Sequence, residues 1–224
     1  MNRQIRHSAL VVGLGRFGSA AAERLTALGW EVVGVDIDGE VVQSMRDRIG
    51  HVVQLDARDI DALATLDIPG FEVCIVSRAA GIESSILLVL NLQQLGATRI
   101  LAKAASEQHA RILRRLGLAE IVFPERDAGV RLAESIQAPN LVQWIDLEGD
   151  REVAVLVVPE HRVGTRLREW REIQRPSVYV LGRLTRDGRP REVNRDEPLL
   201  SGEVVIVVGP VADIMRLAAS ASEP

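Results

Sequence analysis

The chain has 224 residues, 47% hydrophobic and 26% charged, which is typical of a globular protein with one large domain or two small ones. This composition excludes disorder as the main state, and an aromatic content of 3% indicates an aliphatic core. A net charge of −4, with Lys103 as the only lysine, argues against nucleic acid or an anionic membrane surface as a partner. No apolar run is long enough to span a membrane. The single cysteine, Cys74, lies in an apolar stretch, which predicts a buried thiol in a cytoplasmic protein.

Strands and helices alternate through the first 124 residues. We expect strands at 10–12, 31–38, 51–57, 71–77, 98–104 and 119–124. Between them we expect helices at 19–30, 40–50, 60–68, 82–96 and 106–117. Ser106 is a capping residue for the last of these helices. The alternation predicts an α/β fold with a Rossmann-like, doubly wound parallel sheet and helices on both faces.

The pattern changes after Pro124. A helix is expected at 127–137, followed by strands at 141–149, 152–159, 177–188, 191–194 and 203–210 and short helices at 165–173 and 212–220. Asp187 and Gly188 form a hairpin-turn signal. We therefore predict a first domain at 1–125, a connecting helix at 126–137, and a second, smaller α+β domain at 138–224.

The segment 13–18, GLGRFG, follows a predicted strand and opens a predicted helix. Gly13 allows the tight turn, Gly15 lets a phosphate approach the backbone, and Gly18 lets helix and strand pack closely. The free N–H groups and the dipole at the helix start favour an anion. Asp36 ends the second strand, where a carboxylate accepts hydrogen bonds from ribose hydroxyls. The spacing predicts nucleotide binding, and the Arg16 guanidinium is suited to phosphate oxygens.

Further candidates lie at the carboxyl ends of the parallel strands, where ligands of open α/β sheets bind. They are Asp56, Ala57, Ser77, Arg78, Lys103, Pro124 and Glu125, together with His109 on the helix after Lys103.

The second half lacks the groups that a dehydrogenase needs. It offers His161 and Tyr179 but no lysine, and the chain has no Walker-type loop and no His/Cys set with metal-ligand spacing. A small NAD(P)-dependent oxidoreductase is therefore the weaker alternative, and the sequence indicates that the protein is not an enzyme.

The chain resembles the RCK (regulator of potassium conductance) proteins, the regulatory subunits of bacterial Ktr and Trk potassium uptake systems. The most specific segments are the GRFG form of the loop at 15–18 and PERDAGVRLA at 124–133, and the resemblance covers essentially the whole chain. It implies homodimers that form through the nucleotide-binding domains and assemble into an octameric ring. The ring would lie in the cytoplasm, docked on a separate membrane potassium pore subunit at the inner face of the membrane.

The resemblance also implies roles for individual residues. Phosphates would be held by Gly13, Gly15, Arg16 and Phe17 beside Gly18, the ribose by Asp36, and the adenine would lie by Asp56 and Ala57. Arg78, Lys103 and His109 would surround the ligand, and Glu125 would lie near a terminal phosphate or bind Mg²⁺ or Ca²⁺. Arg78 departs from the small residue that the family often has. Arg16 favours ATP/ADP, with NAD(H) as the alternative ligand. A stand-alone nucleotide sensor is a further alternative.

Overall fold

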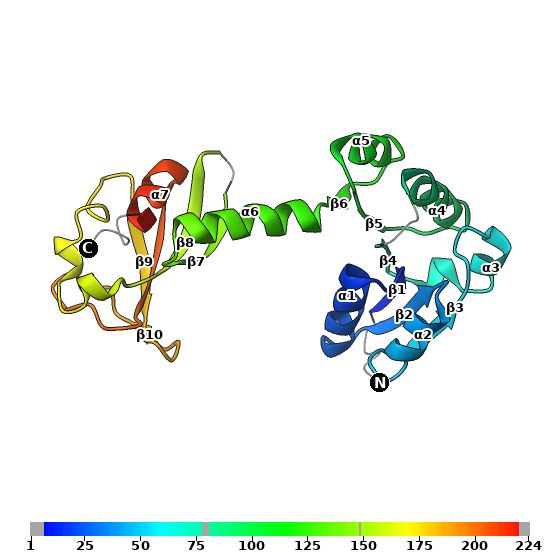
Figure 1. The fold of residues 1–224 in the computed structure, drawn as a ribbon, viewed down its shortest axis with the longest axis horizontal. Coiled ribbons are helices and arrows are strands. Elements are labelled where there is room, and N and C mark those ends of the chain that lie inside the picture. The colour runs from blue at the N-terminus through cyan, green and yellow to red at the C-terminus, as the bar shows by residue number, and fades with distance from the viewer. Residues whose placement is uncertain (1–6, 78–80, 148, 220–224) are drawn as a thin grey trace, which may run out of the picture. The chain divides into compact units, whose positions relative to one another are not determined.

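The computed structural model describes residues 7–77, 81–147 and 149–219. The chain divides into two compact units, Met1–Arg126 and Asp127–Pro224 (Figure 1). Among the described residues, no helix has the length and apolar character needed to cross a membrane.

The first unit is a six-stranded parallel sheet in the order β3-β2-β1-β4-β5-β6. Its strands are β1 (Ser8–Val12), β2 (Glu31–Asp36), β3 (His51–Gln54), β4 (Val73–Val76), β5 (Ile100–Lys103) and β6 (Glu120–Val122). Its helices are α1 (Arg16–Ala27), α2 (Gly39–Met45), α3 (Ile60–Ala64), α4 (Ile82–Gln94) and α5 (Glu107–Arg115). The predicted doubly wound sheet is confirmed. The strand order reverses between the parallel neighbours β1 and β4, and the carboxyl ends of these strands are where such folds bind ligands.

Both faces of this sheet are covered, which explains the unbroken apolar run of β1. Successive residues alternate between two cores: Leu10 packs in one with Leu88 of α4 and Leu113 of α5, and Val11 packs in the other with Ala22 of α1 and Met45 of α2. Cys74 is fully buried in the first core, as predicted, and burial raises the pKa of its thiol to about 12.

The second unit is a five-stranded antiparallel sheet in the order β10-β9-β11-β8-β7, with α7 (Val211–Ala219) packed on β11 and β8. Its strands are β7 (Leu141–Asp146), β8 (Arg151–Val157), β9 (Tyr179–Leu184), β10 (Pro190–Arg191) and β11 (Val204–Pro210). This sheet and its helix confirm the predicted second α+β unit. Of the strand expected at 191–194, only Arg191 lies in a strand, as the last residue of β10.

The helix expected at 165–173 is wrong. Only a 3₁₀ turn forms there, Leu167–Glu169, besides the 3₁₀ turn Glu160–Arg162 earlier in the unit. The buried side chains of this segment are Leu167, Trp170 and Ile173, three residues apart. That spacing fits a 3₁₀ turn as well as a helix. A bridge from Arg166 to Pro198 ties the start of the turn to a distant loop.

The connecting helix α6 runs from Pro124 to Gln137 and so begins three residues before the predicted start. Proline is compatible with this position, because the first turn of a helix needs no N–H donor and the proline φ suits a helix. None of the α6 residues is buried within the described structure.

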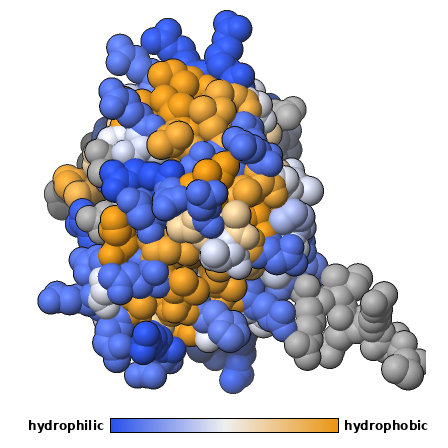
Figure 2. Space-filling view, turned by 90° about the vertical axis from the view of Figure 1, so that its right-hand side faces the viewer, coloured by the Kyte–Doolittle hydropathy of each residue, from blue (hydrophilic) through white to orange (hydrophobic). Residues whose placement is uncertain are grey.

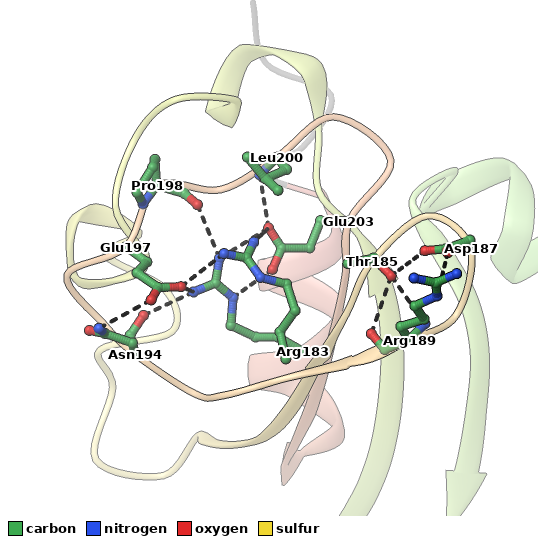
Figure 3. Close-up of polar contacts among 10 residues, drawn as sticks. Arg183, Thr185, Asp187, Arg189, Asn194, Glu197, Pro198, Leu200 and Glu203 are labelled. Carbon is green, nitrogen blue, oxygen red and sulfur yellow. Dashed lines mark hydrogen bonds and ion pairs between the residues drawn. The ribbon is translucent and has the colours of Figure 1, made fainter.

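A buried ion pair organises the second unit (Figure 3). The guanidinium of Arg183 on β9 is fully buried and donates from Nε to Oε1 of Glu203 at 2.6 Å and from Nη2 to Oε2 at 3.0 Å. It also donates to the carbonyl oxygens of Asn194 at 2.9 Å and Pro198 at 3.1 Å, and Glu203 accepts the backbone N–H of Leu200. The network therefore fixes the loop 194–200 against the sheet.

Candidate functional site

The glycine loop joins β1 to α1 by a turn that only glycine accommodates easily. Gly13 has a φ of +89°. A Cβ at Gly18 would lie 1.9 Å from the carbonyl oxygen of Gly13, so any side chain there would push the helix away from the strand. No side chain caps α1, whose N-cap is Gly15. Its first-turn N–H groups therefore form an opening suited to an anion.

Asp36 ties the end of β2 to this loop. Its side chain is 4% exposed and accepts the backbone N–H groups of Leu14 at 2.7 Å and Asp38 at 3.0 Å. Each carboxylate oxygen uses one lone pair in this way and keeps another for a ligand. These two hydrogen bonds fix the carboxylate in position before any ligand binds. Asp36 lines a pocket together with Gly13.

The same pocket contains Asp56 and Ala57 beyond β3, with apolar walls from Leu55 and Leu88. Arg58, which the sequence reasoning missed, also lines it. Its Nε and Nη2 donate to the two oxygens of Asp56 at 2.9 and 2.6 Å, and these hydrogen bonds lower the pKa of Asp56. In the sequence, Arg58 could have been found from its position two residues after the carboxylate of Asp56. The pocket combines apolar side chains with the carboxylate acceptors of Asp36 and Asp56, which suits a nucleoside.

A second pocket contains the start of α1 and two cations. It is lined by Gly15, Arg16, Phe17, Gly18, Ser77, Lys103 and Glu125. The guanidinium of Arg16 is exposed and makes no hydrogen bond or ion pair with the described residues. Lys103 at the end of β5 donates to Glu125 in the first turn of α6, and this hydrogen bond lowers the pKa of Glu125.

His109 lines a third pocket with Lys103 and Ser85. The ring is 3% exposed, and burial lowers its pKa. Its Nδ1 accepts the backbone N–H of Ala105 at 3.2 Å, so the neutral ring carries its proton on Nε2. Within the described residues that Nε2 and the buried hydroxyl of Ser85 have no partner. Sequence reasoning did not single out Ser85, which lies in the first turn of α4 and carries no motif signal.

The structure thus brings together the predicted site residues other than Arg78 and Pro124 in three pockets at the carboxyl edge of the parallel sheet. Ser77 and Lys103 each line two of these pockets, and Pro124 lines none of them. Arg78 lies outside the described residues. Ser106 caps α5 as predicted, because its hydroxyl accepts the backbone N–H of His109 at 3.2 Å.

A divalent cation at Glu125 fits poorly with this chain alone. The described residues contain no group of three His, Cys, Asp or Glu side chains placed to hold a metal ion. Glu125 is the only carboxylate of its pocket and has Lys103 as its counterion.

The chain matches a known protein family and is similar to known potassium uptake proteins. The family model of the TrkA-N domain matches residues 9–124, from β1 to the start of α6. Ktr system potassium uptake protein A of Bacillus subtilis (strain 168) is 35% identical over 147 residues, which are 66% of each chain. Ktr system potassium uptake protein C of the same organism is 30% identical over 208 residues, 92% of this chain and 93% of that protein.

A solved structure described as the GsuK channel bound to NAD has the same fold. It is 20% identical, with a TM-score of 0.66. The match covers 100% of this chain but 41% of the GsuK chain, so this chain spans less than half the length of that channel.

Proposed function

Because the chain belongs to the TrkA-N family and is a relative of Ktr potassium uptake proteins, we propose that it is the nucleotide-binding regulatory subunit of a potassium uptake system. It is a regulator and not an enzyme. In this role a separate polypeptide, the membrane pore subunit, conducts potassium. The chain itself would lie on the cytoplasmic side and change the conductance of that pore when its ligand changes.

The observation that carries the proposal is the buried carboxylate of Asp36, held against the glycine loop by the N–H of Leu14. This contact fixes an acceptor for ribose hydroxyls beside the uncapped start of α1, where phosphates bind. The pocket that Asp36 lines also contains Leu55 and Ala57 beyond β3, and its apolar walls suit an adenine.

We propose ATP and ADP as the ligands. Arg16 and Lys103 place two cations beyond the start of α1, and terminal phosphates carry more negative charge than a bridging pyrophosphate. NAD(H) is the alternative. The pocket with His109 and Ser85 favours it, because two unpartnered buried polar groups there could bind the second nucleoside.

We further propose that the chain forms homodimers through the nucleotide-binding units and that these assemble into an octameric ring. Apolar side chains gather on the face of the first unit in Figure 2. On α4, Leu87 is 45% and Leu90 is 43% exposed, and on α5 Ile112 is 40% exposed. Side chains of this kind on one unit support contact between copies.

The test is potassium flux into vesicles that contain the pore subunit, with the chain added. We expect ATP and ADP to give different flux, and we expect Asp36→Ala to remove the difference while the pore keeps its basal flux. A chain that binds nucleotide but leaves the flux unchanged would contradict the regulatory role and favour a stand-alone sensor.

A further inference from the structure

The pocket that receives phosphates in the proposed function already contains an anion. Glu125 lies in it with Arg16 and Lys103, and the Lys103–Glu125 ion pair joins the end of β5 to the first turn of α6. The positive charge of Arg16 also acts on Glu125 and lowers its pKa further, after the larger effect of Lys103. Without ligand, the carboxylate is therefore the counterion of the cations in this pocket.

A phosphate entering this pocket competes with that carboxylate. The Glu125 side chain is 65% exposed and the Lys103 side chain 25% exposed, and ion pairs with such access to water are weak. A phosphate brings more negative charge and three acceptor oxygens, and it also gains the N–H groups at the start of α1. If both anions stayed in the pocket they would repel each other.

We propose that Glu125 is a displaceable internal anion, which holds Lys103 in the unliganded protein and loses it to the terminal phosphate of a bound nucleotide. The proposal rests on the proposed function and adds a regulatory step to the same site. The exchange breaks the ion pair that joins the first turn of α6 to the end of β5. The state of α6 then depends on whether the ligand carries a phosphate that reaches Lys103, and adenosine would leave the ion pair intact.

Removing the carboxylate tests the competition. Glu125→Gln should bind ADP about two- to fivefold more tightly than the wild type, the range of an exposed ion pair, with the gain falling at high salt. Adenosine affinity should stay unchanged. The matched control is Glu120→Gln, which breaks the exposed pair of Glu120 with Arg99 outside the pocket and should leave ADP affinity unchanged. Calorimetry in EDTA keeps divalent cations out of the measurement.

The exchange itself can be observed because Lys103 is the only lysine. Protein labelled with ¹³C-lysine gives one ε-methylene NMR signal. We expect the signals of wild type and Glu125→Gln to differ without ligand and with adenosine, and to coincide at saturating ADP, because Lys103 then contacts phosphate in both proteins. Signals that still differ at saturating ADP would overturn the exchange alone. If calorimetry detects no binding of ATP, ADP, NAD⁺ or NADH, the proposed function fails as well.

Discussion

The two units of this molecule differ in how their central cationic side chains are paired: Arg183 in the second unit, and Arg16 and Lys103 in the first. In the second unit the Arg183 guanidinium is fully buried and has four hydrogen-bond contacts, two to Glu203 and two to backbone carbonyls. In the first unit Arg16 is exposed without a partner among the described residues, and Lys103 has a single exposed counterion. Arg183 is thus part of the fold, whereas Arg16 and Lys103 remain available to a ligand.

The same contrast extends to the loops. The loop at 194–200 is fixed by the side-chain network around Arg183, and the turn at 164–165 pairs with Leu199 through backbone hydrogen bonds. The start of α1 has no side-chain cap. A buried charge without a counterion and hydrogen-bond partners is costly. The complete set of partners around the Arg183 guanidinium therefore indicates a structural role. An open cationic pocket beside uncapped N–H groups indicates a binding role.

The largest expected effect comes from breaking the satisfied network. Arg183→Met removes the main counterion of the buried Glu203, which keeps only the backbone N–H of Leu200 and a longer contact with Arg191, and should lower the free energy of unfolding by about 3–5 kcal/mol. Urea unfolding followed by tryptophan fluorescence measures this, because Trp144 and Trp170 lie in the second unit and Trp30 lies in the first. Arg99→Met breaks an exposed pair and should lower the free energy of unfolding much less than Arg183→Met does. Equal losses for the two variants would mean that Arg183 is not the structural cation that its burial indicates.

Asp36→Ala should have the next largest effect. It removes the charged acceptor for ribose hydroxyls, and the affinity for every adenine nucleotide should fall by about 1.5–3 kcal/mol. Isothermal calorimetry measures this loss. Asp38→Ala is the matched control: it removes the same charge two residues away, where Asp38 caps α2 outside the pocket. Comparable losses in both variants would show that general charge, and not the ribose contact, determines affinity.

Arg16→Ala should cost less, about 1 kcal/mol, because water screens an exposed guanidinium. If Arg16 contacts a terminal phosphate, ATP should lose more affinity than ADP, and both losses should shrink as salt rises. Arg24→Ala in the last turn of the same helix should leave both affinities unchanged. Equal losses for ATP and ADP would place Arg16 at the inner phosphates, and a loss confined to NADH would reverse the choice of ligand.

The smallest effect concerns an exception in the second unit. Glu152 is 4% exposed with its Oε1 unpartnered, and burial, together with the charges of Asp146 and Glu134, raises its pKa above the ordinary 4.5. The folded protein therefore binds this proton more tightly than the unfolded chain, and stability is lost as the pH rises from 4.5 through the raised pKa.

Glu152→Gln cannot ionise and should not show this loss. Unfolding experiments across the pH range should show that the free energy of unfolding of the variant rises relative to that of the wild type above pH 4.5. Below pH 4.5 the difference between the two proteins should stay constant. Glu192→Gln, at an exposed position, should follow the wild type throughout. A constant difference between Glu152→Gln and the wild type at all pH values would mean that Glu152 does not titrate in this range.

The parts of the fold that follow local rules were predictable from the sequence. The glycine spacing and the apolar run of β1 specified the strand, turn and helix at the site, because Gly13 adopts a positive φ and Gly18 has no room for a Cβ. The segment 165–173 was not predictable, since the spacing of Leu167, Trp170 and Ile173 fits two structures and a distant bridge to Pro198 decides between them.

In the site, residues at strand ends could be found by position alone. The partners of those residues could not: Arg58 holds Asp56 and Lys103 holds Glu125 through contacts that depend on side-chain direction. The unpartnered Nε2 of His109 likewise follows from packing between helices and leaves no trace in the sequence.

The central claim is that the pocket formed by the glycine loop and Asp36 binds an adenine nucleotide. The most direct measurement is a titration of ATP, ADP, NAD⁺ and NADH against the full chain, read as a shift in melting temperature, for wild type and Asp36→Ala. Since a ligand of the folded state raises the melting temperature, we predict that ATP and ADP raise that of the wild type and have a much weaker effect on the variant. A wild-type melting temperature that none of the four nucleotides changes would contradict the claim.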